Sequence, residues 1–366
     1  MKKIAINCRT LNKRHGGPKR FLLNLLLNLA KVDLQNEYII ILDKKLSFSL
    51  SLPGNFKIVV LKTKSRLIYE YIKLPFFVNR LKPDIYIVPD PCFSPLIKTK
   101  KIAIYHDIIY FEKDQKREFK FFDNLHHKIM IPLCGKRANL NICDSNFTQA
   151  RVKELLGFKN TKVIYLGVEE SFRPHPSNNF SDKILKKYNI TKPFIFYIGS
   201  MSPRKNVERM ISSFLLIKNE ISHNLYLLGG YSWKDAKIRK ILEKDEVKDR
   251  VKKIGYIDEA DLPIIYSLAD VFLYPSLYEG FGLPILESQA CACPVITSNI
   301  GAMKEIAGDG AMLINPFDEK NISLAIKNLT SNSALRLEII ERGKKNLDRF
   351  SWLNFAKELI AQYEKI

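Results

Sequence analysis

Short, continuous apolar runs rich in isoleucine, valine and tyrosine recur along the first half of the chain. Runs of this kind are typical of strands that a sheet buries on both faces. Longer stretches between them place apolar residues at helical spacing. We predict strands at residues 4–8, 38–42, 57–61, 85–88, 102–105, 140–143 and 163–166, and helices at 19–31, 66–81, 118–136 and 147–156. Strands that alternate with helices predict parallel βαβ units and a doubly wound sheet.

The pattern changes at residues 171–192, which are polar, contain Pro174 and Pro176 and show no periodicity, as expected of a linker. A second strand–helix series follows. We predict its strands at residues 194–198, 225–228, 251–254, 271–274, 295–297 and 312–314, and its helices at 206–218, 233–244, 259–268, 284–292, 320–331 and 334–349. Since 366 residues exceed one ordinary core, the pattern predicts two α/β domains.

The end of the chain is a separate feature. Apolar residues Phe355, Leu359, Ile360 and Tyr363 follow at helical spacing after Trp352 and predict a helix with one buried face. We therefore divide the chain into a first domain at 1–172, a linker at 173–192, a second domain at 193–349 and a terminal helix at 350–366. Ligands of doubly wound sheets bind beyond the carboxyl ends of the strands, so two such domains facing a central cleft suit a substrate with two parts.

Charge is distributed unevenly over a total of +21. Residues 1–170 contain 31 basic and 15 acidic side chains, whereas residues 171–366 contain 28 and 23. The basic first half suggests an anionic partner: nucleic acid, a phospholipid surface or a phosphorylated acceptor. A lysine-rich, solvated surface is the alternative, and charge alone leaves both open.

Nothing in the sequence predicts a membrane span or a disulfide framework. The longest apolar stretch, residues 21–30, is interrupted by Asn24 and Asn28 and is shorter than the roughly 20 residues that cross a bilayer. Residues 1–7 lack the apolar core of a signal peptide, so we expect a cytoplasmic protein. The six cysteines lack the paired spacing of a metal site and are expected to be buried thiols.

The most informative segment connects the strand predicted at 271–274 to the helix predicted at 284–292. It carries Glu279 and two glycines, Gly280 and Gly282, which let the backbone approach a ligand. The first N–H groups of the helix can bind phosphate or hydroxyl oxygens. Glu287, one turn into the helix, can accept hydrogen bonds from two neighbouring ribose hydroxyls, while Glu279 is placed to reach a sugar. A helix-capping loop with two solvated acids is the structural alternative.

This segment resembles the retaining glycosyltransferases of family 4, which have the GT-B fold of two Rossmann-like domains. Glu279 and Glu287 match the family's pair of glutamates eight positions apart, with Gly280-Phe281-Gly282-Leu283-Pro284 between them. The resemblance implies that Glu279 lies by the donor sugar and Glu287 holds the ribose. It implies that backbone groups of Phe281, Gly282 and Leu283 cover sugar and phosphate, and that the terminal helix crosses back onto the first domain.

Two cations support this interpretation. Arg204 and Lys205 follow the strand predicted at 194–198, just before a helix, where they can neutralise a diphosphate and the charge that develops as it leaves. The stretch Pro203-Arg204-Lys205-Asn206 resembles bacterial mannosyltransferases that build O-antigen polysaccharide. Ser200 stands where many relatives have an arginine, which leaves the cation role to Arg204 and Lys205.

The first domain offers two further candidates. Gly16 and Gly17 follow the first strand and precede a helix, so their N–H groups can face a phosphate, although a plain turn is the alternative. His106 ends the strand predicted at 102–105 and resembles the family's histidine that contacts the donor sugar. The stretch Asp144-Ser145-Asn146 offers N-cap residues for the helix predicted at 147–156. The other histidines considered (His15, His126, His127 and His175) are expected to be structural.

The sequence therefore predicts a retaining transferase that binds a nucleotide-diphosphate sugar. An acceptor hydroxyl would attack the face from which the diphosphate leaves, with the diphosphate as base. We expect no cofactor and no metal, because no Asp-x-Asp motif occurs. GDP-mannose is the favoured donor, and a glycan on a polyprenyl diphosphate is the expected acceptor, with an anionic membrane as a possible partner of the basic half. Rival interpretations are a nucleotide-sugar 2-epimerase, a nucleic-acid-binding protein and a GT-B scaffold without catalysis.

Overall fold

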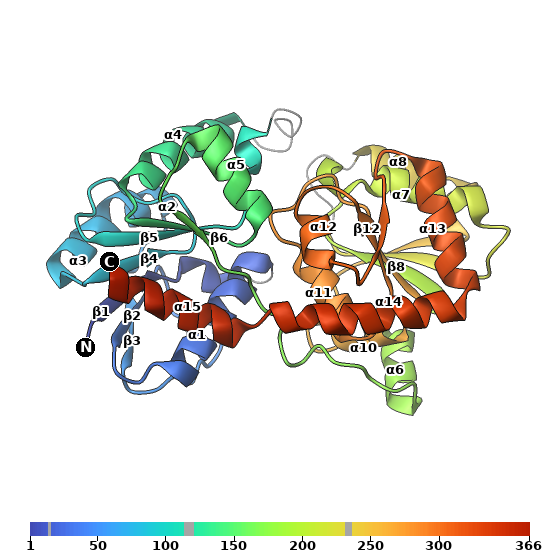
Figure 1. Cartoon of the computed structure of the whole chain (residues 1–366), viewed down its shortest axis with the longest axis horizontal. Coiled ribbons are helices and arrows are strands. Elements are labelled where there is room, and N and C mark those ends of the chain that lie inside the picture. Colours follow the sequence, from blue (N-terminus) through green and yellow to red (C-terminus); the bar gives the residue numbers. More distant parts are fainter. Residues whose placement is uncertain (14–15, 113–120, 231–235) are drawn as a thin grey trace. The chain divides into compact units, whose positions relative to one another are not determined.

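The chain forms two compact units in a computed structural model that describes residues 1–13, 16–112, 121–230 and 236–366 (Figure 1). One unit contains Met1–Gly167 together with Ser351–Ile366, and the other contains Val168–Phe350. The sequence placed the end of the first domain at residue 172, five residues later. Both units are α/β and each is built on one all-parallel sheet, so the predicted fold class is confirmed.

The described residues of the first unit form a sheet in the order β3-β2-β1-β4-β5-β6-β7. The strands are β1 (Lys3–Asn7), β2 (Glu37–Leu42), β3 (Phe56–Val60), β4 (Ile85–Val88), β5 (Lys100–Tyr105), β6 (Leu140–Cys143) and β7 (Thr161–Val163). Ile6 pairs with Ile40 on one side and Ile87 on the other. The strand order reverses between β1 and β4, which is where doubly wound sheets place their ligands.

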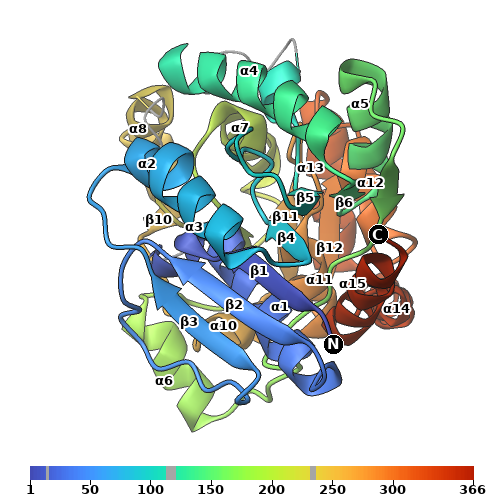
Figure 2. The same cartoon turned by 90° about the vertical axis from the view of Figure 1, so that its left-hand side faces the viewer.

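Helices cover both faces of this sheet (Figure 2). They are α1 (Gly17–Val32), a continuous helical segment of α2 (Arg66–Ile68), η2 (Tyr69–Lys73) and α3 (Leu74–Leu81), then α4 (Phe121–Arg137), α5 (Asn146–Leu156) and α15 (Trp352–Lys365), with η1 (Arg9–Asn12) and η3 (Ile109–Phe111) as short 3₁₀ turns. Val78 of α3, Ile131 of α4 and Leu156 of α5 share one core with Ala5 of β1. Because neighbouring strand residues face opposite ways, Ile4 and Ile6 serve the other face.

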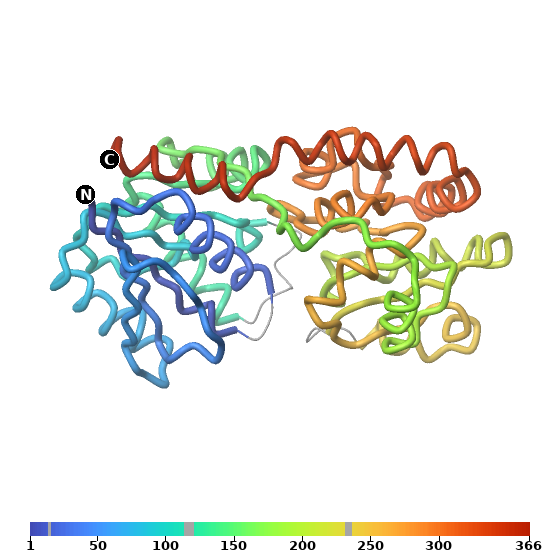
Figure 3. Tube along the Cα trace, turned by 90° about the horizontal axis from the view of Figure 1, so that it is seen from below, coloured from blue at the N-terminus to red at the C-terminus, as the bar shows by residue number. Residues whose placement is uncertain are grey.

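The terminal helix α15 belongs to the first unit and packs on α1. Phe21 of α1 meets Phe355 edge-on with ring centroids 5.6 Å apart, and Trp352 at 5.8 Å. The backbone of Trp352 lies so close to Gly167 that a Cβ at Gly167 would stand 2.1 Å from its nitrogen. The N-terminus and C-terminus consequently lie near each other in this unit (Figure 3).

The second unit has a sheet in the order β10-β9-β8-β11-β12-β13 among its described residues, so β8 and β11 form its switch point. The strands are β8 (Phe194–Ile198), β9 (Asn224–Leu228), β10 (Val251–Ile254), β11 (Val271–Tyr274), β12 (Val295–Ser298) and β13 (Met312–Ile314). The helices are α6 (Asn179–Lys187), α7 (Val207–Ile217), α8 (Ala236–Leu242), α9 (Asp245–Lys248), α10 (Leu262–Leu268), α11 (Leu283–Ala290), α12 (Gly301–Ala307), α13 (Glu319–Ser331) and α14 (Ser333–Asn346), with η5 (Pro203–Lys205) and η6 (Leu347–Arg349).

The structure differs from the expected linker at 173–192, because α6 lies inside it. Asn178 and Ser181 form a reciprocal capping box, and Leu185 is buried in the core of the second unit. The helix has nine residues, which is too short for its periodicity to stand out from the polar residues before it. The helices predicted from 118 and 233 begin outside the described residues, and within the described part of the chain no helix is long and apolar enough to cross a membrane.

Candidate active site

Glu279 lies between two cations in the second unit. Its carboxylate accepts hydrogen bonds from Arg204 Nη1 at 2.7 Å and from Lys205 Nζ. Lys205 Nζ also donates to the Tyr274 hydroxyl at 2.7 Å. The cations follow β8 and the carboxylate follows β11, so the two strands at the switch point bring together residues that are far apart in sequence. The structure therefore groups three of the predicted donor-site residues.

The two cations control the charge of Glu279. Burial by itself raises the pKa of a carboxyl group, but Arg204 and Lys205 outweigh it and lower the pKa of Glu279 to about 2. Glu279 is therefore an anion throughout the physiological pH range. It can stabilise positive charge on a sugar, and it cannot serve as a general acid in this state.

Asn206 fixes the loops that carry these side chains. Its backbone is left-handed, with φ at 59°, a conformation that asparagine tolerates better than most residues. The side-chain amide donates to Pro275 O at 3.0 Å and to Pro316 O at 2.7 Å. Asn206 thus joins the loops after β8, β11 and β13. The sequence analysis included Asn206 only as the last residue of the Pro203–Asn206 stretch and did not predict that it joins these loops.

The loop between β11 and α11 places the remaining donor candidates. Gly282 is the N-cap of α11 with φ at +111°, which an L side chain rarely adopts, and Leu283 begins the helix. Phe281 is buried and packs edge-on against Phe350, with ring centroids 5.9 Å apart. Gly280 lies between Glu279 and Phe281 in the same loop.

Glu287 lies in α11 and is 2% exposed. Its Oε2 accepts a hydrogen bond from the Tyr266 hydroxyl of α10 at 3.0 Å. Tyr266 therefore holds one oxygen of the carboxylate, and sequence reasoning missed this positioning residue. The only signal available was an aromatic residue in an apolar helix, which is ordinary core composition.

In the first unit, Gly16 and Gly17 begin α1. Gly16 is the N-cap with φ at +114°, and Gly17 is the first helical residue, followed by Pro18. A Cβ added to Gly17 would meet nothing within 4 Å. The fold thus explains the glycine at position 16, whereas position 17 has no steric reason to be glycine.

Gly17→Ala should leave folding intact and lower sugar transfer. The helical backbone accepts alanine, so the melting temperature should stay equal or rise slightly. If a phosphate approaches this N–H group, the added methyl group should lower kcat/KM roughly tenfold, about 1.4 kcal/mol. Gly54→Ala is the matched control, because a Cβ there also meets nothing within 4 Å. Equal activity in both variants would show that Gly17 has no ligand role.

His106 follows β5 and is held by a buried carboxylate. Its Nδ1 lies 2.5 Å from Asp144 Oδ2, and its ring meets Phe21 of α1 with centroids 4.5 Å apart. The N-cap of α5 is Ser145, one of the residues predicted for this role, and its Oγ accepts a hydrogen bond from Thr148 N at 3.0 Å. Cys143 pairs with Tyr105 in the sheet, so Asp144 and His106 end neighbouring strands. Asp144 fixes the orientation of the imidazole and leaves Nε2 for a ligand.

Asp144→Asn should lower the pKa of His106. Burial lowers that pKa, but the Asp144 charge and hydrogen bond raise it above its ordinary value overall. A raised pKa in the folded protein contributes stability that is full below pH 6.5, the ordinary value, and lost as the pH rises through the folded pKa. The His106 NMR titration midpoint should therefore fall in the variant, and the stability difference should shrink above pH 6.5. An unchanged midpoint would contradict the pairing.

A cavity of about 210 Å³ opens beside His106 in the first unit. His106, Asp107 and Asp90 line it together with Lys13 and Tyr110. These residues follow the carboxyl ends of β1, β4 and β5, at the switch point of the sheet. Nε2 of His106 is buried and has no hydrogen-bond partner among the described residues. The cavity therefore combines two carboxylates, a cation and an imidazole nitrogen, groups that bind sugar hydroxyls.

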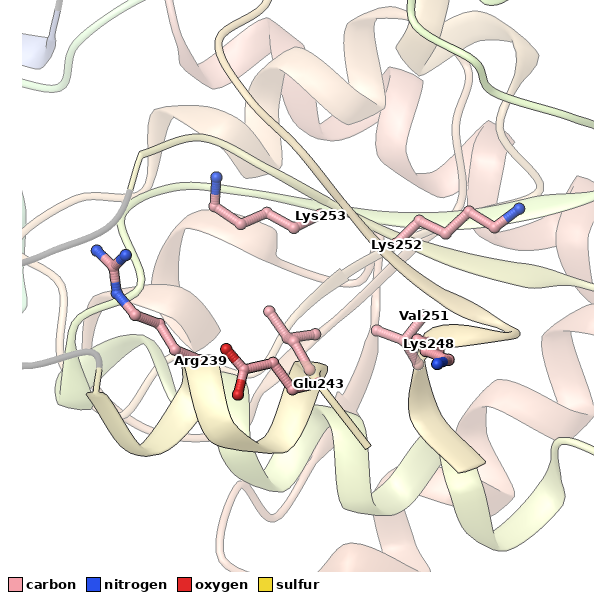
Figure 4. Close-up of a pocket in the computed structure, with 7 residues that line it drawn as sticks. Arg239, Glu243, Lys248, Val251, Lys252 and Lys253 are labelled. Carbon is pink, nitrogen blue, oxygen red and sulfur yellow. The ribbon is translucent and has the colours of Figure 1, made fainter. Parts of the chain in front are cut away.

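The second unit has two further cavities. One of about 410 Å³ lies at the edge strand β10 and is lined by Arg239, Glu243, Lys248, Lys252 and Lys253 among others (Figure 4). Its polar side chains are exposed apart from Lys253, and it contains none of the predicted site residues. The other, also about 410 Å³, borders the loop that carries Arg204 and Lys205, with Ser202, Pro203, Asn206 and Leu277 in its lining.

Comparison with known proteins identifies glycosyltransferases as relatives of this chain. Residues 180–346 match the family of glycosyl transferases group 1. The matched residues lie within the second unit. Over 288 residues it is 28% identical to O-antigen chain mannosyltransferase B of Escherichia coli, covering 76% of this chain and 74% of that protein. It is also 28% identical to the serotype-specific mannosyltransferase WbdA of Escherichia coli over 77% of this chain, which is about a third (35%) of that longer protein.

The solved structures agree on the fold. The crystal structure of Anabaena Alr3699/HepE in complex with UDP-glucose has a TM-score of 0.77 at 15% identity and covers 100% of both chains. At this identity the likeness establishes the GT-B fold alone. The glycosyl transferases group 1 match and the mannosyltransferase relatives support a hexosyltransferase, and these relatives favour neither the epimerase nor the nucleic-acid-binding interpretation.

Proposed function

We propose that this glycosyltransferase moves mannose from GDP-mannose to a growing glycan, with retention of the anomeric configuration. The observation that supports this proposal most directly is the cluster of Glu279, Arg204 and Lys205. Two fixed cations suit the diphosphate of a nucleotide sugar. The fixed anion suits the positive charge that develops on the sugar as the diphosphate leaves. The mannosyltransferase relatives support the choice of sugar.

In this proposal the second unit holds the donor. Arg204 and Lys205 bind the diphosphate, Glu287 binds the ribose hydroxyls, and the N–H groups at Gly282 and Leu283 lie at a helix N-terminus suited to oxygen ligands. The first unit supplies Gly16, Gly17 and His106, and its 210 Å³ cavity receives the acceptor. The leaving diphosphate takes the proton of the attacking hydroxyl. Arg204 and Lys205 supply the charge compensation that a metal ion provides in other transferases, so the proposal includes no catalytic metal.

The donor is tested by measuring the shift in melting temperature with GDP, UDP and dTDP and their sugars, followed by transfer of labelled mannose to a polyprenyl-diphosphate glycan. We expect stabilisation by GDP-mannose, a product with the α configuration of the donor, and an unchanged kcat at saturating acceptor in excess chelator. An inverted product, or release of a free epimer without acceptor, would overturn the proposal.

A second observation concerns where the acceptor is presented. Four large apolar residues of the α2–α3 segment (Leu67, Ile68, Ile72 and Phe76) are exposed, and so are four of α4 (Phe121, Phe122, Leu125 and Ile129). We call these eight residues the apolar face. Its two helices are neighbours, because the Tyr71 hydroxyl lies 2.6 Å from His126 Nε2. Exposed apolar clusters of this kind mark interaction surfaces.

We propose that the apolar face rests on an anionic membrane. Exposed cations lie within the α2–α3 segment or close to its ends in sequence: Lys62, Lys64, Lys73, Arg80 and Lys82. Apolar side chains flanked by cations suit an interface with negatively charged headgroups. A lipid-linked acceptor would be supplied from the same surface.

Sedimentation with vesicles tests this surface. The full chain should bind phosphatidylglycerol vesicles and lose binding in phosphatidylcholine or high salt. Phe76→Ser and Phe121→Ser should each weaken binding roughly tenfold, since burying such a side chain contributes about 1.5–3 kcal/mol. Phe180→Ser and Phe317→Ser, at exposed phenylalanines of the second unit, are matched controls. Equal loss in all four variants would contradict the assignment.

A further inference from the structure

Three metal-binding side chains meet in the first unit, outside the donor residues. Cys92, His126 and His127 each place a possible ligand atom within 4.8 Å of the others. Cys92 lies four residues beyond β4, and the two histidines are adjacent in α4. Sequence reasoning read the histidines as structural and the cysteine as a buried thiol, because a cysteine 34 positions from a histidine pair has no recognisable metal spacing.

The surroundings orient the two histidine rings. His127 Nδ1 lies 2.7 Å from the backbone oxygen of Asp123, so Nδ1 carries the proton and Nε2 keeps its lone pair. His127 is also stacked on Tyr110, with ring centroids 4.0 Å apart and an angle of 4°. His126 Nε2 is held by the Tyr71 hydroxyl, which leaves Nδ1 as its second nitrogen. Partners of this kind, a backbone carbonyl and a hydroxyl, fix ligand rings around bound metals.

We propose that Cys92, His126 and His127 form a binding site for a soft divalent transition metal, with Zn²⁺ as the chief candidate. One sulfur and two imidazole nitrogens select this class over Mg²⁺ or Ca²⁺, which prefer oxygen ligands. Three protein ligands leave the fourth tetrahedral position for water or another small ligand.

The proposed metal site borders the cavity beside His106. His127 also lines the 210 Å³ cavity that contains His106 and Asp107. A bound ion would fasten α4 to the segment after β4 and add positive charge beside Asp90 and Asp107. The proposed ion is separate from the transfer chemistry, and it would change how this cavity binds an uncharged or anionic acceptor.

Cobalt titration of the purified full chain, freed of metal by a chelator, tests the site. One equivalent of Co²⁺ should give the near-ultraviolet charge-transfer band of a cobalt thiolate, and Zn²⁺ should remove it by displacement. Cys92→Ser should abolish the band and weaken Zn²⁺ binding at least about 10–100-fold, the range that even outer-shell changes cause. His126→Asn should weaken Zn²⁺ binding to a similar extent, and Tyr71→Phe about tenfold.

Cys143→Ala is the matched control, since Cys143 is a buried cysteine of the same unit outside the cluster. It should keep both the band and the affinity. Stabilisation of each variant by GDP reports folding and tests the donor proposal separately. Absence of the band, or weak binding of several equivalents that no variant alters, would show an adventitious ion only and overturn the site.

Discussion

Glu279→Gln should abolish sugar transfer and tighten the binding of GDP. Without its charge, the side chain cannot stabilise a positively charged sugar, and kcat should fall by about a thousandfold. The carboxylate occupies both Arg204 and Lys205, so a diphosphate must compete with it for these cations. Neutral glutamine removes that competition, and the Kd for GDP should fall several-fold. Calorimetry with GDP and a transfer assay measure the two effects.

Glutamine is preferable to alanine here because it keeps the volume and one hydrogen bond for buried Lys205. Removing one partner of a buried ion pair altogether costs about 3–5 kcal/mol. The folded pKa of about 2 lies below the ordinary value of 4.5, so the ion pairs contribute stability above pH 4.5 that is lost as the pH falls toward 2. The stability difference between parent and variant should narrow over that interval.

The control for Glu279 is Glu338→Gln, at an exposed glutamate of the same unit that pairs with Arg342. It should leave both turnover and GDP affinity unchanged. Near-normal transfer by Glu279→Gln would remove the central catalytic assignment. Weaker GDP binding in a variant with normal melting would remove the competition argument while leaving the catalytic role intact.

Arg204→Met should lower kcat/KM by about 10²–10³, the usual effect of removing one donor that stabilises developing charge. In contrast with Glu279→Gln, it should also weaken GDP binding, because the guanidinium is 23% exposed and can reach a diphosphate as well as Glu279. Arg204→Lys should recover only part of the activity, since an ammonium group lacks the planar pair of donors.

Steady-state kinetics and GDP calorimetry check this expectation, with Arg342→Met as the control arginine. Arg342 is exposed and pairs only with Glu338 among the contacts described. A variant that kept GDP affinity and lost only kcat would place Arg204 on the sugar side of the donor. Unchanged kinetics would leave Lys205 as the sole cation of the diphosphate site.

Much of the fold could be predicted because buried parallel strands leave a strong local pattern. The strand at 271–274 could be predicted because its residues are all apolar. The helix after Gly282 could be predicted because glycine and proline mark its first turn. Helix α6 was missed because nine residues with one buried leucine differ little from a polar loop. Its capping box consists of hydrogen bonds made by two side chains, and the residue types alone do not establish these bonds.

The sequence predicted which residues belong to the candidate site, and the structure showed which of them contact one another. Glu279, Arg204 and Lys205 were each proposed from the sequence, but their ion pairs depend on β8 and β11 being neighbours. The N-cap of α5 was predicted within Asp144-Ser145-Asn146, but the contact of Asp144 with His106 was not, because it depends on β5 and β6 being neighbours. Tyr266 and Asn206 gave no separate signal, since their roles consist of one and two hydrogen bonds, respectively, to segments distant in sequence.

The sequence by itself determined the two α/β units, the cations and the acids of the candidate site, and the basic character of the first half. These properties follow from local periodicity, spacing and charge, which can be obtained from the sequence without knowing the fold. Only the tertiary structure decided that Asp144 orients His106, that two cations lower the pKa of Glu279, and that Cys92 meets the histidines of α4. Each of these depends on which strands and helices become neighbours, and that is set by the packing of the whole core.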